Sequence, residues 1–297
     1  KPIILKMDDK IYFPILISYT DKEFGGYFDT EADYKDDFIA SRLKEESNWA
    51  IFPINPHSYD SINISNSTPN PARPSIHNYL GTDDRGRDVL ARLIYGFRLS
   101  VLFAFVLTAI GIIIGIFFGA IQGYFAGRVD LYMQRFIEIW SSMPELYILI
   151  IFSSLFEPSI FLLIVLLSLF GWMSLSDYVR AEFLKGRNME YVVAARTLGL
   201  SNTKIILKHI LPNSMVSVIT FLPFRISGAI LILTSLDFLG LGVPPDTPSL
   251  GELLAQGKEN IEAWWLSLST FLVLVGTLLL LIFIGEGIRE SLDSRSS

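Results

Sequence analysis

Long apolar segments alternate with polar stretches along the last two-thirds of the chain. Five of them are long enough for a helix to cross the roughly 30 Å of hydrocarbon in a bilayer, which takes about 20 residues. They cover residues 99–123, 136–156, 161–179, 212–239 and 264–284. Because an open sheet leaves backbone groups without hydrogen bonds in lipid, these segments predict an all-α polytopic membrane protein.

The loops between these segments differ in charge, and the difference predicts which side of the membrane each loop faces. Residues 180–212 hold six Lys and Arg residues against two acids, whereas residues 240–263 hold one Lys against four acids. The first loop is therefore expected in the cytoplasm, together with the C-terminus. The second loop and everything before Arg98 are expected outside.

Residues 1–79 are polar and are expected to form an extracytoplasmic, periplasmic region. This stretch has no apolar core of a signal sequence, so we expect that an N-terminal membrane helix, the first of six, is missing and that five spans are present. Numerous aromatic residues are enough for a modest core. Two interpretations stay open: a loop packed on the membrane domain, or a docking surface for a protein that delivers substrate.

Residues 80–98 are expected to form an interfacial amphipathic helix on the outer membrane surface, ahead of the transmembrane domain at 99–297. Thr82 or Asp83 can cap its start, because a side-chain oxygen accepts a free backbone N–H. Apolar residues then recur at helical spacing. The acids and arginines of this stretch are expected to form a local salt-bridged cap rather than a metal or substrate site.

The first span carries four glycines, each four residues after the last. Because four residues advance an α-helix by about one turn, the glycines trace one groove along it. Small residues at this spacing let two helices approach closely in lipid. We therefore expect helix packing, compatible with a flexible hinge, at Gly111, Gly115, Gly119 and Gly123.

Glu145, Arg225 and Asp237 are charged residues of the apolar spans, where an ionised group is costly unless it faces protein or water. Glu145 follows Pro144, which interrupts the second span. Arg225 lies near the middle of the fourth span, and Asp237 lies near its outer end. We expect Arg225 to pair with Glu145 or Asp237. It is either part of a structural ion pair or, with these acids, a charge that lines a translocation path.

The cytoplasmic loop, at about 180–212, is predicted to contain two short helices at an angle. Residues 189–198 suit the first, with Gly199 just after its end, where a positive φ costs glycine little. Ser201 is placed to cap the second helix. That helix is expected to run to Pro212, where the chain turns into the fourth span.

Two adjacent alanines, Ala194 and Ala195, lie in the first of these helices. Their side chains have almost no bulk, so the surface of another protein can approach the backbone. A stiff elbow that is joined to a span can act as a lever, because a force on the elbow moves the span. Two alanines and a glycine do not by themselves distinguish this loop from an ordinary cytoplasmic loop.

Residue types that carry out catalysis are scarce. The chain has no cysteine, which excludes disulfides, thiolate metal sites and cysteine nucleophiles. His57, His77 and His209 lie outside the spans in separate loops, and the sequence shows no Ser-His-Asp or metal-ligand cluster. The sequence also contains no G-x-x-x-x-G-K-[ST] motif, so the chain should not hydrolyse ATP alone. We expect no catalytic residue, no metal and no cofactor in this chain, which disfavours a membrane hydrolase.

Five motifs in order carry a resemblance to a known family. The motifs are Leu-Gly-Thr-Asp at 80–83 with Gly-Arg-Asp at 86–88, Ala-Ala at 194–195 with Gly199, His-Ile-Leu-Pro-Asn at 209–213, Phe-Leu-Gly-Leu-Gly at 238–242 and Pro-Ser-Leu-Gly at 248–251. On these motifs the sequence from residue 80 onward resembles the C-type permeases of dipeptide and oligopeptide ABC importers. Further stretches resemble the YejE-type permeases among them: Tyr-Phe-Pro at 12–14, Phe-Gly-Gly at 24–26, Ala-Asp-Tyr at 32–34, Trp-Met-Ser-Leu at 172–175 and Ser-Leu-Asp at 235–237. One departure is Val193, where the family's coupling signature usually has an acid.

The resemblance implies the transmembrane domain of a type I ABC importer in the bacterial inner membrane. It implies a heterodimer with a second permease subunit, two ABC ATPase domains, separate or fused, that bind ATP and Mg²⁺, and a periplasmic binding protein that delivers oligopeptides or peptide-like antibiotics of the microcin C type. It implies no nucleic acid. The ATPase-coupling signature corresponds to Tyr191, Val193, Ala194, Ala195, Arg196, Leu198, Gly199, Ser201, Leu211 and Pro212.

An ion-coupled secondary peptide carrier is the alternative function. Glu145, Asp177, Arg225 and Asp237 would then form a charge relay across the membrane. Such a carrier needs no ATPase, but it leaves the coupling loop without a role.

Overall fold

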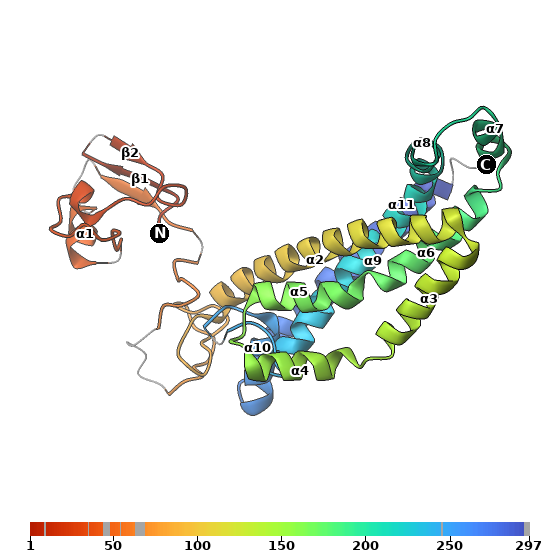
Figure 1. Cartoon of the computed structure of the whole chain (residues 1–297). Coiled ribbons are helices and arrows are strands. Elements are labelled where there is room, and N and C mark those ends of the chain that lie inside the picture. The colour runs from red at the N-terminus through yellow and green to blue at the C-terminus, as the bar shows by residue number, and fades with distance from the viewer. Residues whose placement is uncertain are drawn as a thin grey trace. The chain divides into compact units, whose positions relative to one another are not determined.

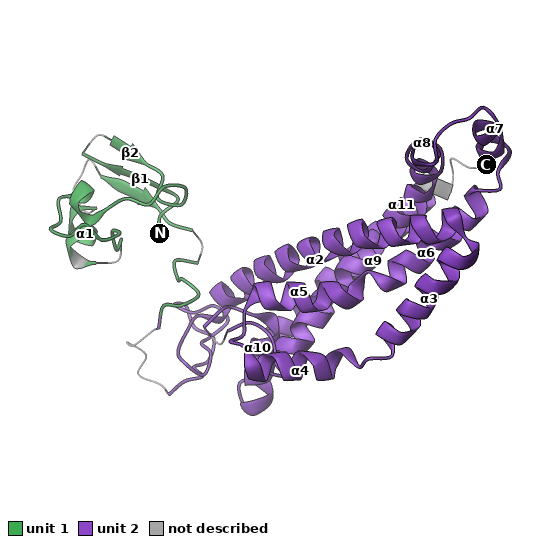
Figure 2. Ribbon diagram, viewed as in Figure 1, with its two compact units in different colours: residues 1–61 green, residues 62–297 purple. Residues whose placement is uncertain are grey.

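The computed structural model describes residues 1–8, 10–34, 36–43, 48–53, 55–62, 69–244 and 246–293. The chain forms two compact units, Lys1–Ser61 and Ile62–Ser297 (Figure 2). The first unit is thus shorter than the region expected at 1–79. Residues 62–79 belong to the second unit, in which the Ala72 N–H donates to the Thr82 hydroxyl at 2.8 Å.

The first unit contains a three-stranded antiparallel sheet of order β2-β1-β3. Its elements are β1 (Ile4–Met7), β2 (Lys10–Tyr12), a 3-10 turn (Asp21–Phe24), α1 (Asp37–Arg42) and β3 (Trp49–Ile51). Each strand is only three or four residues long. A sheet of such short strands needs side chains packed on one face to be stable.

A small hydrophobic core covers one face of this sheet. Leu5 and Met7 are two residues apart on β1 and therefore point to the same side. They pack with Phe24, Ala32, Tyr34 and Ile39. Burial raises the pKa of the Tyr34 phenol to about 12. The unit therefore has a core of its own, in which Phe24 and Tyr34 are the buried aromatic residues.

The second unit is a helical bundle (Figure 1). Its helices are α2 (Val89–Phe125), α3 (Gly127–Ser141), α4 (Glu145–Leu155), α5 (Ile160–Gly171), α6 (Met173–Gly186), α7 (Glu190–Thr197), α8 (Asn202–Ile205), α9 (Leu211–Phe238), α10 (Leu250–Glu259) and α11 (Trp264–Asp293). α2 packs against α6 and α9, and α9 packs against α11. The short helices α7 and α8 lie at one end of the bundle, and α10 lies at the other (Figure 1).

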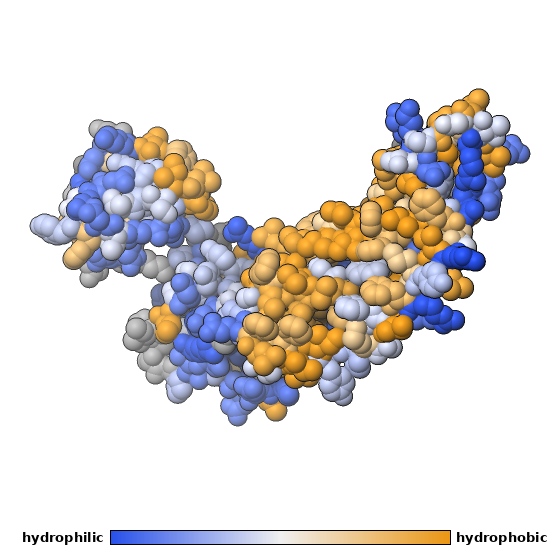
Figure 3. Space-filling model, in the orientation of Figure 1, coloured by the Kyte–Doolittle hydropathy of each residue, from blue (hydrophilic) through white to orange (hydrophobic). Residues whose placement is uncertain are grey.

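Within the described residues, four helical segments are long and apolar enough to cross a bilayer: Val89–Phe125, Ile160–Gly186, Asn202–Phe238 and Trp264–Ser291. There are five if the pair α3–α4, bent by 61°, is counted as one span. Pro144 stands at this bend, where its missing N–H and its ring interrupt the helix. Apolar residues gather along the flank of the bundle, between more polar ends (Figure 3). The predicted all-helical membrane fold is confirmed.

The structure differs from the expectation at residues 80–98. Residues 89–98 are the first turns of α2, which continues without a break into the first span, since no proline interrupts the sequence between them. Asp88 caps this helix by accepting the Ala91 N–H at 2.8 Å. Thr82 and Asp83, the expected caps, bind loop residues instead.

The chain also does not turn at Pro212. α8, a π-helical turn (Ile206–Ile210) and α9 form one helical segment from Asn202 to Phe238. Pro212 is the second residue of α9 and directly follows the π-helical turn, where the regular α-helical hydrogen bonding is already interrupted. The second predicted short helix is therefore the beginning of the fourth span, and the chain bends between α7 and α8.

The glycine groove of α2 consists of Gly111, Gly115, Gly119 and Gly123, which are all buried. A Cβ atom at Gly119 would lie 2.5 Å from the Ser176 carbonyl oxygen of α6, and one at Gly115 would lie 3.0 Å from the Leu175 Cβ. Side chains here would collide with α6, because the contact leaves no free volume. The groove thus brings the backbones of α2 and α6 together.

Candidate functional site

The loop between α6 and α9 begins with α7, which ends in a Schellman motif. Gly199 has a φ of +77°, in the left-handed region that favours glycine. Its N–H donates to the Arg196 carbonyl at 3.0 Å, and the Leu200 N–H donates to the Ala195 carbonyl at 3.1 Å. The predicted helix end at Gly199 is confirmed, and the loop has a defined backbone geometry.

Ser201 precedes α8 as expected, and its carbonyl accepts the Ile205 N–H at 3.0 Å. Its side chain makes no capping hydrogen bond, so the predicted side-chain cap is wrong. The cap matters less than expected because α8 continues into the fourth span rather than standing alone. Of the other predicted coupling residues, Leu211 is half-buried against the bundle and Pro212 is exposed.

The inner face of α7 packs on the bundle. Val192 and Ala195, three residues apart, are buried on this face, where they pack with Ile205 and Ile210 at the start of the fourth span. Ala194 is exposed. The expectation that both alanines offer a bare surface is therefore wrong for Ala195, whose small side chain instead lets α7 lie close to the bundle.

The rest of α7 is exposed, and apolar side chains alternate there with the polar ones of Glu190, Arg196 and Thr197. Tyr191, Val193, Ala194 and Leu198, which we call the α7 patch, are all exposed, Leu198 to 80%. Exposed apolar side chains that gather on one segment are typical of a contact with another protein or with lipid. The α7 patch is therefore a candidate contact surface at this end of the bundle.

Polar contacts join the loop to the rest of the bundle. Arg196 lies over the Tyr124 ring at 5.6 Å, a cation–π arrangement, and the Tyr124 hydroxyl donates to Asn202 Oδ1 at 2.7 Å. Asn213 Nδ2 donates to the Tyr191 hydroxyl at 3.1 Å. Polar contacts therefore link α7 to α2 and to the fourth span.

A cavity of about 330 Å³ lies within the bundle. Residues of α2, of the α3–α4 bend, of α5, of the start of α6 and of α9 line it, and its polar side chains are Thr108, Ser141, Glu145, Ser168, Ser174 and Arg225. Glu145 and Arg225 were both predicted for a translocation path, and they line one and the same cavity. The neutral polar residues were missed, because they come from separate helices and no local pattern marks them.

Arg225 has neutral partners rather than acidic ones. Its Nη1 donates to Ser174 Oγ at 3.1 Å and its Nη2 donates to the Gly171 carbonyl, while its Nε is buried without a hydrogen bond. The expected ion pair with Glu145 or Asp237 is therefore wrong. The guanidinium reaches Gly171 because Gly111 beside it has no side chain: a Cβ there would lie 3.1 Å from Nη2.

Asp237 is buried near the end of α9 and does not line the cavity. Its Oδ1 accepts the Val243 N–H at 2.8 Å, and its Oδ2 accepts the Ser249 hydroxyl. Ser249 in turn caps α10. The role expected for Asp237 in a translocation path is therefore replaced by a structural one: it holds the loop that leads into α10.

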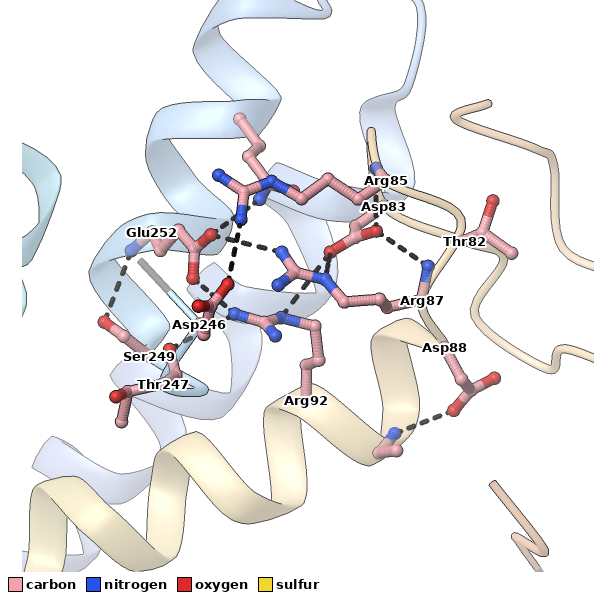
Figure 4. Close-up of polar contacts among 12 residues, drawn as sticks. Thr82, Asp83, Arg85, Arg87, Asp88, Arg92, Asp246, Thr247, Ser249 and Glu252 are labelled. Carbon is pink, nitrogen blue, oxygen red and sulfur yellow. Dashed lines mark hydrogen bonds and ion pairs between the residues drawn. The ribbon is translucent and has the colours of Figure 1, made fainter. Parts of the chain in front are cut away.

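The α10 end of the bundle carries a buried ion-pair cluster of Asp83, Arg87, Arg92 and Glu252 (Figure 4). Asp83 lies 2.7 Å from Arg87 and 3.5 Å from Arg92. Glu252, at the start of α10, pairs with both arginines, and Arg92 also donates to the Thr247 carbonyl at 3.2 Å. The expected salt-bridged cap is present, but Glu252 was missed because it is 160 positions from Arg92 in the sequence.

Asp83 and Glu252 are both paired with arginine side chains. In the part of the chain that the structure describes, no three His, Asp or Glu side chains are grouped so that they could hold a metal ion.

An all-helical bundle with bilayer-length spans, an apolar flank and a helical elbow at one end defines a multi-pass membrane protein. Residues 111–297 match the family described as "Binding-protein-dependent transport system inner membrane component". The chain belongs to this family.

Three curated relatives show how far the similarity extends. The chain is 49% identical to the inner membrane ABC transporter permease protein YejE of Escherichia coli K12, over 99% of this chain and 86% of that protein. It is 46% identical to the peptidoglycan transport system permease protein YejE of Agrobacterium fabrum, over 100% and 84%. It is 36% identical to the oligopeptide transport system permease protein OppC of Haemophilus influenzae, over 81% and 77%.

A solved structure supports the fold. The chain is similar to one from the methionine ABC transporter MetNI in an inward-facing conformation, with a TM-score of 0.57. The two sequences are 17% identical, and the similarity covers 68% of this chain and 96% of that one. At this identity the similarity concerns the arrangement of the helices and not the transported molecule.

Proposed function

We propose that this chain is a permease subunit of an ATP-driven ABC importer that takes up oligopeptides or peptide-like antibiotics, and that ATPase subunits act on it through α7. Relatives named as ABC, peptidoglycan and oligopeptide transport permeases support the transport class. The observation that carries the coupling role is the α7 patch: it is exposed and apolar, and it stands on a helix with a defined end that is joined to the fourth span.

The importer would contain a second permease subunit, two ATPase domains, separate or fused, that hold ATP and Mg²⁺, and a periplasmic binding protein that delivers the peptide. The excess of Lys and Arg at 180–212 supports a cytoplasmic position for α7 and for the C-terminus. The first unit and the α10 end would then face the periplasm. Microcin C is a candidate substrate because the sequence resembles YejE-type permeases.

The mechanism follows from the continuity of the fourth span. ATPase subunits that close on ATP would push on the α7 patch. The helical segment from Asn202 to Phe238 begins beside α7 and carries Arg225 at the cavity. A tilt of this segment therefore changes the shape of the cavity, which supports a place for Glu145 and Arg225 on the translocation path. In this proposal the α7 patch contacts the ATPase subunits. Ala195, on the buried face of α7, positions this helix against the bundle.

The alternative, an ion-coupled carrier, is not supported. Its four relay residues are not brought together: Asp237 is bound to Ser249 at the α10 end, and Asp177 accepts a hydrogen bond from Gln134 at 3.1 Å. Among the relatives described above, the names point to ABC and peptide transport instead.

The test is peptide uptake by the complete importer in proteoliposomes. We expect ATP-driven uptake to fall at least roughly tenfold in Leu198→Glu, because a charge in an apolar contact is left without a partner. Leu198→Met, which keeps the side chain apolar, is the control and should retain uptake. Both variants should insert into the membrane, since Leu198 is 80% exposed. Uptake driven by a proton gradient without ATP would overturn the proposal.

A further inference from the structure

The cavity in the bundle contains two opposite charges that do not neutralise each other. Arg225 binds only the Ser174 hydroxyl and the Gly171 carbonyl, both of them neutral. Glu145 lines the same cavity from the α3–α4 bend, and among the described residues it makes neither a hydrogen bond nor an ion pair with another side chain. A charge in a membrane span without a charged partner is costly, and such residues are typical of binding sites.

Arg225 has hydrogen-bond donors to spare at the cavity. A guanidinium carries several N–H groups, and among the described residues the Ser174 hydroxyl and the Gly171 carbonyl accept from Nη1 and Nη2. Arg225 lines the cavity, so its remaining N–H groups are available to an anionic group in addition to its charge.

The backbone leaves room beside these groups. A Cβ atom at Gly171 or Gly228, both in the wall of the cavity, would meet nothing within 4 Å. The volume of about 330 Å³ is at the lower end of the range for small-molecule sites. The cavity therefore has room for a small ligand with two charged ends.

We propose that this cavity binds short peptides of two or three residues as zwitterions, with the terminal carboxylate at Arg225 and the terminal ammonium at Glu145. The proposal rests on the proposed function and specifies the ligand that the membrane subunit itself recognises. The N–H groups of Arg225 that the Ser174 hydroxyl and the Gly171 carbonyl leave free donate to the carboxylate. Because both charges must be matched at once, a peptide with one blocked terminus binds more weakly.

The experiment measures binding of radiolabelled Ala-Ala to the purified permease–ATPase complex in nanodiscs, without the binding protein, so that only the membrane subunits select. Competitors are Ala-Ala amide and N-acetyl-Ala-Ala. We expect each blocked peptide to compete at least roughly tenfold more weakly than Ala-Ala, because each loses one charge-assisted contact.

Two variants test which residue binds each terminus of the peptide. Arg225→Gln should weaken Ala-Ala binding at least roughly tenfold and abolish the discrimination against the amide. Glu145→Gln should also weaken Ala-Ala binding, and it should abolish the discrimination against N-acetyl-Ala-Ala. Arg135→Gln and Glu138→Gln are matched controls, because these two residues form an exposed ion pair on α3 outside the cavity, and they should bind like the unmodified complex. ATP hydrolysis by each complex shows that it is assembled.

A variant without a charge change keeps the proposal testable if a charge variant does not assemble. Gly228→Val adds a side chain to the open cavity wall and should lower Ala-Ala binding. Gly276→Val, on α11, where a Cβ also meets nothing within 4 Å, should not.

The outcomes separate this proposal from the proposed function. It is overturned if Ala-Ala does not bind, if the blocked peptides compete as well as Ala-Ala, if the charge variants leave the discrimination unchanged, or if Gly228→Val leaves Ala-Ala binding unchanged. Should the complete importer still take up peptide with ATP in that case, the proposed function stands without the site. Absence of any ATP-driven peptide uptake would refute the proposed function itself.

Discussion

The two ends of the helical bundle are built in opposite ways. At the α10 end, Arg92 is fully buried and paired with Asp83 and Glu252. At the α7 end, an exposed apolar patch stands on a helix held by a few neutral and cation–π contacts. Buried ion pairs lose much stability when one partner is removed and so fix one arrangement. The α10 end is therefore locked internally, and the α7 end is left open to an outside contact.

Two arginines show the same contrast at the level of single residues. Arg92 lies between two carboxylates, whereas among the described residues Arg225 in the cavity has only neutral partners. Arg92 is fully buried and Arg225 is partly buried. The difference lies in whether the protein itself supplies the counter-charge.

The largest effect is expected where the bundle is locked. Asp83→Ala should lower the free energy of unfolding by about 3–5 kcal/mol, because it leaves two buried guanidiniums with one acid fewer. Thermal unfolding of the purified protein in detergent measures this. Asp246→Ala is the control: that side chain is 99% exposed and lies 3.5 Å from Arg85, and no measurable loss is expected. Equal losses in both variants would contradict the locked α10 end.

The next effect tests the helix contact that connects the two ends. Gly119→Val should cost about 1–3 kcal/mol, because the added side chain collides with the α6 backbone at Ser176. The same thermal measurement applies. Gly276→Val, in open space on α11, should cost clearly less. A stable Gly119→Val protein would show that α2 and α6 can separate without loss.

A smaller and local effect is expected at the elbow. Gly199→Ala should cost about 1–2 kcal/mol, because a residue with a Cβ is strained at a φ of +77°. The cost should appear as faster amide hydrogen exchange in residues 196–201, with the α10 end unchanged. Gly287→Ala, at a position in α11 without a positive φ, should leave this exchange as it is. Unchanged exchange in Gly199→Ala would show that the Schellman motif does not hold the elbow.

The smallest effect concerns the link between α2 and the loop. Tyr124→Phe removes the hydrogen bond to Asn202 and keeps the ring under Arg196, so we expect a loss of about 0.5–1.5 kcal/mol. Thermal unfolding measures the loss. Tyr132→Phe is the matched control, because Tyr132 is 70% exposed. A larger loss of stability in the control would contradict the role of Tyr124 in linking α2 to the loop.

Local patterns in the sequence determined much of this architecture. Length and apolarity are enough to place the spans, since a bilayer requires about 20 apolar residues per helix. Glycines four apart predict the groove on α2, because helical spacing is fixed by the backbone. The end of α7 at Gly199 follows in the same way from the need for a positive φ. Each of these features depends on residues close together in the chain.

Only the tertiary structure decided the partners of the charges and the faces of α7. Arg225 binds Ser174 and Gly171 instead of an acid, and Arg92 meets Glu252 from the far end of the chain. Ala195 is buried although Ala194 beside it is exposed. Such outcomes depend on which helices pack side by side, and the energy of a charge depends on distances of a few ångströms that no local spacing sets.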